Sequence, residues 1–127
     1  MSELNSAHNR AVWFDLPVSD LERAATFYRA VLNIGVDVMK FGPVEFAVLA
    51  HDQGNGGCLV VQPEAITSVG ALLYLNANGR IRDAVAQAVK LGGKIMEDVQ
   101  ATGSHGFRAV ILDSEGNRVA LHSARDG

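Results

Sequence analysis

The feature that most constrains this chain is a strand–turn–helix unit near its start, spanning Ala11 to Ile34, which the chain later repeats. The second half of the unit has apolar residues at the spacing of one face of an amphipathic helix. These residues are Leu21, Ala24, Ala25, Tyr28, Val31 and Leu32. The pattern predicts a helix near residues 20–32, with Ser19 as its N-cap and Glu22 completing a capping box.

The first half of the unit alternates with period 2, which predicts a strand with two different faces. Val12, Phe14 and Leu16 form the apolar face that should pack against the helix. Trp13 and Asp15 should then point to the opposite side of the sheet.

The helical spacing returns about 60 residues later. Five positions match the first helix with a shift of 60: Ile81, Ala84, Val85, Ala88 and Leu91. Asn78 is a candidate N-cap, and Gly92-Gly93 should end this second helix, expected near residues 80–91.

Strand and turn segments also repeat, with a shift of 62. Residues 47–49 match residues 109–111, and Gly54-Asn55 matches Gly116-Asn117. Further strands are expected at residues 36–41, 44–50, 58–62 and 72–77. The repeat therefore predicts an α+β fold with two tandem βαβββ modules, about residues 11–62 and 70–123, within a single domain over residues 1–127.

Composition sets limits on the class of protein. A length of 127 residues with 48% hydrophobic residues suits one globular domain with its own core. The net charge of -3, without a basic run, argues against nucleic acid or an acidic membrane surface as a partner. Residues 1–10 lack a signal-peptide core and are expected to form a loose arm, so the expected location is the cytoplasm. Cys58 is the only cysteine, which excludes an intrachain disulfide.

The run VSDLERAATFYRAVL, the duplication, Gly92-Gly93 and the closing DSEGNRVALHS together resemble the vicinal oxygen chelate superfamily. That superfamily includes glyoxalase I, extradiol dioxygenases, fosfomycin-resistance proteins and bleomycin-resistance proteins, and the resemblance covers about residues 11–123. It implies curved mixed sheets that form a cup, with the helices outside. It also implies a homodimer, because related proteins build their cups by pairing modules. Whether the cup closes within one chain or between two chains stays open.

The resemblance further implies where a divalent metal would be held: at a His or Gln on the first strand of each module and a Glu on the last. Those positions hold Trp13, Leu72, Ala120 and either Cys58 or Val60. A hard divalent cation needs oxygen or imidazole ligands, which these side chains do not supply. The sequence therefore predicts no metal and no cofactor.

Strand parity predicts which side chains line the cup, because residues two apart share a face. The expected ligand-binding residues are Trp13, Asp15, Cys58, Val60, Leu72, Tyr74, Asn76, Ala120 and His122. Trp13 is either core filling or a stacking surface for a ligand, and Tyr74 and Asn76 serve either sheet packing or ligand contact. We expect Trp13, Asp15, Tyr74, Asn76 and His122 to line one cavity.

Asp15 and His122 are the candidate catalytic residues, and each has an alternative interpretation. Asp15 is either hydrogen-bonded for structural reasons or a base or substrate anchor, since an unpaired charge there would be costly. His122 is either exposed or part of the site, and the two could also pair with each other. His105 and Arg108, which follow the Gly103 turn, either belong to a flexible entrance loop or simply face solvent, and the second interpretation is favoured. Glu97 is interpreted as a surface residue.

Two function classes follow. In the first, the protein binds a small, partly apolar or aromatic molecule in its cup without chemistry. In the second, it is a lyase, isomerase or dioxygenase-type enzyme, either metal-free with Asp15 or His122 as general base, or with an atypical metal site. The missing metal ligands favour the first class.

Overall fold

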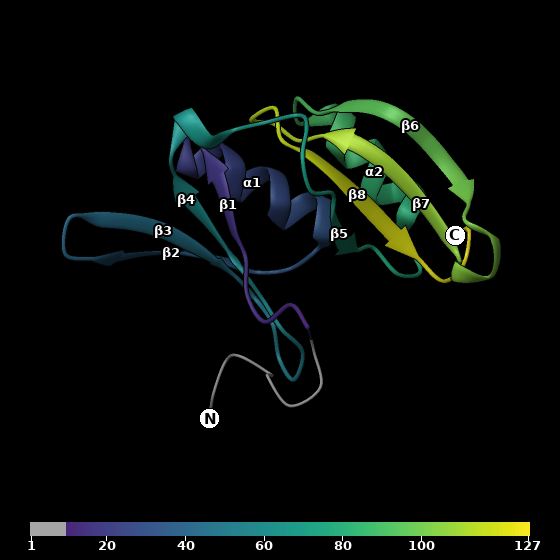
Figure 1. Cartoon of the computed structure of the whole chain (residues 1–127), viewed down its shortest axis with the longest axis horizontal. Coiled ribbons are helices and arrows are strands. Elements are labelled where there is room, and N and C mark those ends of the chain that lie inside the picture. The colour runs from purple at the N-terminus through teal and green to yellow at the C-terminus, as the bar shows by residue number, and fades with distance from the viewer. Residues whose placement is uncertain (1–9) are drawn as a thin grey trace.

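The computed structural model describes residues 10–127 and shows two consecutive modules of strand, helix and three strands (Figure 1). The first module consists of β1 (Asp15–Val18), α1 (Leu21–Leu32), β2 (Val36–Phe41), β3 (Val44–Leu49) and β4 (Cys58–Val61). The second module consists of β5 (Leu73–Asn76), α2 (Ile81–Lys90), β6 (Lys94–Ala101), β7 (Phe107–Leu112) and β8 (Arg118–Ser123). Two short 3-10 helices are η1 (Pro63–Ala65) and η2 (Gly103–His105). The predicted α+β fold is confirmed, whereas the arm expected at residues 1–10 lies almost wholly outside the described residues.

Each module forms one four-stranded mixed sheet, with strand orders β1-β4-β3-β2 and β5-β8-β7-β6. The first strand of each module pairs in parallel with the last one, and the other neighbours are antiparallel. β1 begins at Asp15 rather than at Val12, because its pairing with β4 begins where Asp15 lies opposite Cys58. Pro17 is tolerated within β1 because this is an edge strand, where a missing N–H interrupts no ladder.

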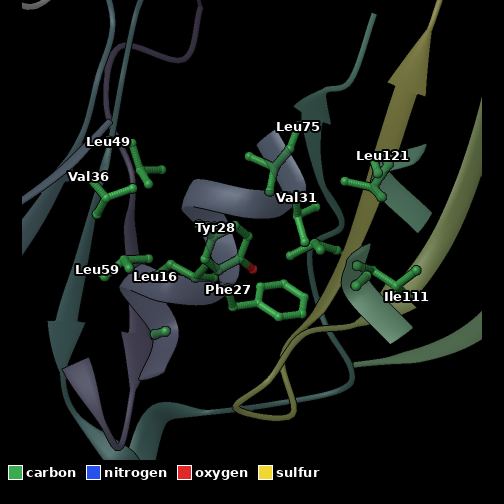
Figure 2. Packing of buried hydrophobic residues seen from close by; sticks show 14 of the residues in the cluster. Leu16, Phe27, Tyr28, Val31, Val36, Leu49, Leu59, Leu75, Ile111 and Leu121 are labelled. Atoms are coloured by element: carbon green, nitrogen blue, oxygen red, sulfur yellow. The ribbon is translucent and has the colours of Figure 1, made fainter. Parts of the chain in front are cut away.

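The core lies between the two sheets and contains the buried faces of both helices. Figure 2 shows Leu16 and Leu59 extending from the first sheet, and Leu75 and Leu121 from the second, towards the region around α1. Helices α1 and α2 contact each other directly. Because both sheets turn their core faces towards the helices, their other faces, the outer faces, point away from each other.

The N-cap of α1 is Asp20, one residue later than predicted. Its side chain accepts a hydrogen bond of 3.0 Å from the backbone N–H of Arg23. Ser19 instead donates both its N–H and its hydroxyl to Glu115, far away in the sequence. Ser and Asp are comparable N-caps, so only this tertiary contact separates the two.

The start of α2 also differs from the prediction. The helix begins at Ile81 with Arg80 as its N-cap, and no side chain caps it. Asn78 lies earlier and accepts a 2.7 Å hydrogen bond from the backbone N–H of Ala124. The predicted stop is confirmed, since α2 ends at Lys90 and Gly92 adopts a φ of +96°, a conformation that favours glycine.

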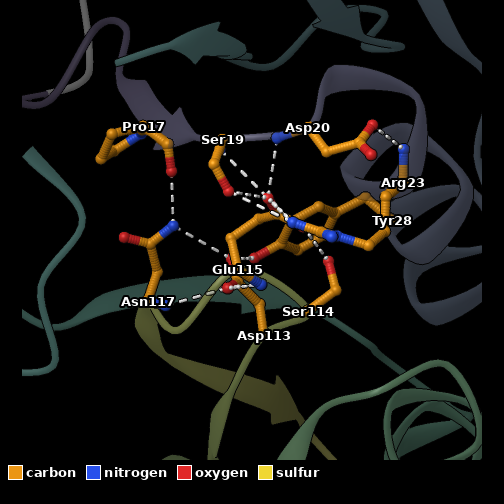
Figure 3. Close-up of polar contacts among 9 residues, drawn as sticks. All are labelled: Pro17, Ser19, Asp20, Arg23, Tyr28, Asp113, Ser114, Glu115 and Asn117. Carbon is orange, nitrogen blue, oxygen red and sulfur yellow. Dashed lines mark hydrogen bonds and ion pairs between the residues drawn. The ribbon is translucent and has the colours of Figure 1, made fainter. Parts of the chain in front are cut away.

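A buried polar network joins the first module to the turn between β7 and β8 (Figure 3). The hydroxyl of Tyr28 donates to Asp113 Oδ2 at 2.6 Å, and both side chains are buried. Asn117 Nδ2 donates to the carbonyl oxygen of Pro17 at 2.6 Å. Glu115 accepts from the start of α1 and forms an ion pair of 2.7 Å with Arg23. These contacts fix the relative orientation of the two modules.

Within residues 10–127, neither helix has the length and apolar character needed to cross a bilayer.

Candidate functional site

The outer face of the second sheet carries a compact cluster of polar and aromatic side chains. Strand register places Asn76 beside His122, and His122 beside Arg108, across β5, β8 and β7. Tyr74 lies on the same face of β5, two residues before Asn76, and half of it is exposed. A cavity of about 520 Å³ opens on this face, lined by Tyr74, Leu75, Asn76, Thr102, His105 and His122.

Direct contacts hold this cluster together. Arg108 Nη1 donates a hydrogen bond to the hydroxyl of Tyr74, and its guanidinium carbon lies 5.9 Å from the centre of the Tyr74 ring. Arg108 Nη2 also forms an ion pair of 3.3 Å with Glu97. The bond to Tyr74, followed by the charge of Glu97, raises the pKa of Arg108 above its ordinary value, so Arg108 is a permanent cation on this face.

His122 is oriented by a backbone contact. Its Nε2 lies 2.6 Å from the carbonyl oxygen of His105, and its ring centre lies 6.3 Å from that of Tyr74. Because a carbonyl only accepts, Nε2 carries the proton, and in the neutral ring Nδ1 is left as an acceptor. His122 can therefore accept a hydrogen bond or a proton through Nδ1.

The outer face of the first sheet carries a second group of the predicted residues. Cys58 Sγ donates to Asp15 Oδ1 at 3.2 Å. Burial, and then this hydrogen bond, raise the pKa of the Cys58 thiol to about 11, so it is protonated at neutral pH and a poor nucleophile. Trp13 precedes β1 and makes an edge-on contact with the ring of His51, at 5.6 Å between centres. Val60 borders a separate cavity of about 370 Å³ near Pro43–Glu45.

The structure thus separates the predicted site residues into two groups. Tyr74, Asn76 and His122 share a cavity, while Asp15 lies on the other sheet, whose outer face points away, and Trp13 lies just before that sheet's first strand. The five residues therefore do not line one cavity within a single chain. Asp15 contacts Cys58 and His122 contacts the His105 carbonyl, so the pairing of Asp15 with His122 is not formed.

The positions that would hold the superfamily's metal do not fit one. Trp13 and Leu72 both lie outside the strands, just before β1 and β5. Ala120 has no exposed surface, and the Cys58 thiol is buried and protonated. Across residues 10–127, no three His, Cys, Asp or Glu side chains are grouped closely enough to bind a metal ion. The donor set offers neither the oxygen nor the imidazole ligands that a hard divalent cation needs.

Three members of the second-sheet cluster were not among the predicted site residues: Glu97, His105 and Arg108. Glu97 and His105 are exposed, as predicted, but Arg108, also predicted to face solvent, is only partly exposed and bridges Tyr74 and Glu97 on the outer face. His105, from η2, contributes both a lining side chain and the carbonyl that orients His122. Alternation along β7 places Arg108 on the outer face, and once β7 is aligned antiparallel to β8, Arg108 lies beside His122.

Comparisons with known proteins agree with this architecture. Residues 10–48 match a family model described as bleomycin resistance protein-like N-terminal. A glyoxalase/bleomycin resistance protein from Albidiferax ferrireducens T118 has a TM-score of 0.73 at 19% identity, covering 91% of this chain and 99% of that one. A genomically encoded fosfomycin resistance protein from Listeria monocytogenes has a TM-score of 0.68 at 12% identity, covering 91% of this chain and 93% of that one.

Glyoxalase I from Zea mays has a TM-score of 0.66 at 22% identity. The alignment covers 88% of this chain but only 45% of the maize protein. No curated protein sequence matches the chain. At these identities the solved structures show the fold and leave the activity open. The predicted resemblance is therefore confirmed: this chain has the fold of the vicinal oxygen chelate superfamily, and its first module resembles the bleomycin resistance proteins in sequence.

Proposed function

We propose that this protein binds a small, partly apolar or aromatic molecule on the outer faces of its sheets, without the superfamily's divalent metal. The observation that carries the proposal is the cavity of about 520 Å³ beside Tyr74, Asn76 and His122. Its volume lies within the range of about 300–1,000 Å³ that is common for small-molecule pockets. Its lining combines aromatic surface with a few polar groups that could orient a ligand.

The chemistry of the lining supports an aromatic ligand with a polar end. The half-exposed Tyr74 ring offers a flat apolar surface, already held by Arg108. His122 offers an acceptor at Nδ1, and Asn76 offers its amide N–H donors, while its Oδ1 already accepts from the backbone N–H of Asn78. A ligand that covers the Tyr74 ring while bonding to His122 or Asn76 would use both features.

We further propose that a second copy of the chain completes the cup. The two outer faces point in opposite directions within one chain, so neither is covered by the other. On the first sheet, Phe41 is 80% exposed and Met39 and Val44 are about half exposed, which is unusual for a face left in water. The first module of one chain could cover the second module of another.

Charge supports this pairing. Register aligns Asp15, Cys58, Val48 and Asp37 across the outer face of the first sheet, so this face carries two acidic residues. The outer face of the second sheet carries Arg108, whose charge is paired with Glu97, and also Arg118, four residues before His122, which adds a positive charge. Opposite charges on two faces favour their association.

One observation favours an enzymatic alternative. The contact of His122 Nε2 with the His105 carbonyl leaves Nδ1 as the basic atom. A side chain oriented in this way could serve as the general base of a metal-free lyase or isomerase. Turnover of a compound that binds at this face, lost in His122→Ala and retained in Val89→Ala, a change on α2, would favour this alternative over binding alone.

The binding proposal is tested by screening aromatic small molecules by calorimetry. A compound that binds should lose most of its affinity in Tyr74→Ala, whereas Val89→Ala, which removes an equally exposed apolar side chain from α2, should leave affinity unchanged. Trp13 is the only tryptophan, so a change in its emission would report whether the first module contributes to the same site. Equal affinity of the wild-type protein and Tyr74→Ala for every compound found would overturn the proposed site.

A further inference from the structure

A second cavity lies in the cleft between the two modules. Its volume is about 410 Å³. Its apolar wall includes Phe14, Leu32, Ile34 and Leu49 at the margin of the core. Its rim consists of the loop that joins β3 to β4 and of the segment from the end of β5 to the start of α2. Phe14, Leu32 and Ile34 are only partly buried, so this part of the core is open.

The duplication provides an internal comparison for this cleft. With the shift of 62, the loop at residues 51–55 corresponds to the turn at residues 113–117. With the shift of 60, the start of α2 corresponds to the start of α1. The chain therefore contains the same loop-to-helix junction twice.

One of the two junctions is filled by the chain itself. The Glu115 side chain has no exposed surface and accepts hydrogen bonds from the backbone N–H groups of Ser19 and Asp20. The corresponding residue in the other junction, Gln53, is exposed, and the cavity occupies the space beside its loop. Among residues 10–127, the loop of the first module thus leaves open a junction that the corresponding turn of the second module closes.

The charges around the cleft indicate the kind of molecule that would fit. Arg80 is already engaged, because it donates to the carbonyl oxygen of Val31 at 2.5 Å and pairs with Asp83 at 2.5 Å. His51 contacts the carbonyl oxygen of Gly54. Asp52 is exposed on the rim, and no ion pair involves it within residues 10–127. The carboxylate of Asp52 is therefore the one charge on the rim without a counter-charge in that range.

We propose that this cleft is a second ligand site, separate from the outer faces, for a small molecule with a compact apolar body and a protonated amine. The apolar body would cover the open wall at Phe14 and Ile34, and the amine would lie at the rim near Asp52. The volume suits such a molecule, and clefts between two packed units are frequent ligand sites.

The test is an NMR titration of the ¹⁵N-labelled full-length chain with 2-phenylethylamine, up to about 10 mM so that weak binding is covered. The amides of Gly54, Gly57 and Asn78 should shift together, while those of Thr102 and His105 in the outer-face cavity should not. Leu75 and Asn76 border both cavities and are left out of the readout. The absence of shifts at Gly54, Gly57 and Asn78, or shifts confined to Thr102 and His105, would overturn the proposal.

Two variants test separately the contribution of the ligand's apolar body and that of its charge. Ala50 is exposed and lines the cleft, so Ala50→Phe should fill it and weaken binding about tenfold or more. Ala86→Phe, on the exposed face of α2, is the matched control and should bind as the wild type does. Asp52→Asn, an exposed change that leaves the core intact, should abolish the preference for 2-phenylethylamine over 3-phenylpropionate. Unchanged affinity in Ala50→Phe, or an unchanged preference in Asp52→Asn, would contradict the assignment.

Discussion

The hydroxyl of Tyr28 and the carboxylate of Asp113 meet at 2.6 Å across 85 positions of sequence, and this bond joins the first helix to the last turn (Figure 3). Burial, and then the neighbouring Asp113 charge, raise the pKa of Tyr28 well above its ordinary value, so the hydroxyl stays a donor. Asp113 also accepts from the backbone N–H groups of Glu115 and Asn117. The bond therefore belongs to a network that holds the two modules in one orientation.

Replacing Tyr28 by Phe should destabilise the protein by about 1–3 kcal/mol, because it leaves the buried Asp113 carboxylate without one of its donors. Urea unfolding followed by circular dichroism measures this change. Tyr74→Phe, which removes an exposed rather than a buried hydroxyl bond, the one from Arg108, is the matched control and should stay within about 0.5 kcal/mol of wild type. Equal stability of the two variants would show that the Tyr28 bond contributes nothing.

Because of Glu115, the free energy of unfolding should decrease at acidic pH. Burial alone would raise its pKa, but hydrogen bonds from Arg23, Asp20, Ser114 and Ser19 lower it to about 2, below its ordinary value of 4.5. Because the Glu115 pKa is lower in the folded protein than in the unfolded chain, the ionised carboxylate stabilises the fold. This stabilisation is fully present above the pKa of the unfolded chain and is lost as the pH falls towards the pKa of the folded protein.

Unfolding free energies measured between pH 7 and pH 2 test this expectation. Wild type should exceed Glu115→Gln in stability by about 1–3 kcal/mol at pH 7, and this difference should shrink from about pH 4.5 downward. Glu64→Gln, at an exposed position, should follow the wild-type curve. A wild-type advantage that stays constant down to pH 2 would contradict the assignment.

The Cys58 thiol should react slowly in the folded protein. A pKa of about 11 against an ordinary value of 9.0 lowers the thiolate fraction at neutral pH by about 100-fold. Labelling with iodoacetamide at pH 7.5 should therefore be much slower in buffer than in urea. Asp15→Asn should speed labelling of the folded protein, because the hydrogen bond to the Asp15 carboxylate, and then its charge, help to raise the thiol pKa. Equal labelling rates for Asp15→Asn and wild type in buffer would show that Asp15 has no such effect.

The purified protein should hold no divalent metal. Trp13, Leu72, Ala120 and either Cys58 or Val60 stand where the superfamily's ligands would be, and they offer no hard donors. Elemental analysis after dialysis without a chelator should find far less than one equivalent of any transition metal. One metal per chain, lost on changing one of these positions, would overturn the prediction.

The chain should form a dimer through its outer faces. Light scattering should give twice the chain mass of 13.5 kDa. Phe41→Asp should shift the protein towards monomer, because it places a charge on the apolar outer face of the first sheet. Val89→Asp is the matched control, since Val89 is 50% exposed but lies on α2, away from both outer faces. A wild-type monomer at micromolar concentration would contradict the proposed shared cup.

Much of the fold can be predicted from the local spacing of apolar residues. The apolar spacing of Leu21, Ala24 and Tyr28 returns at Ile81, Ala84 and Ala88, and this repeat, together with the strand matches shifted by 62, predicts both helices and both modules. Alternation correctly assigned Leu16 and Leu75 to the core and Tyr74 and Asn76 to the opposite face. Such patterns can be read because helix and strand periods are properties of the backbone.

The relative orientation of the two modules could be seen only in the tertiary structure. The alternation along each strand predicts which side chains point away from the helices. It does not predict that the two helices pack against each other, so that the two outer faces point in opposite directions. The placement of Arg108 beside His122 required the alignment of β7 with β8, and the choice of Asp20 over Ser19 as N-cap required Glu115. The sequence by itself determined the modules and the two faces of each sheet, since these follow from local periodicity. Which faces meet, and which polar groups become partners, depends on contacts between residues far apart in the chain, which no local pattern encodes.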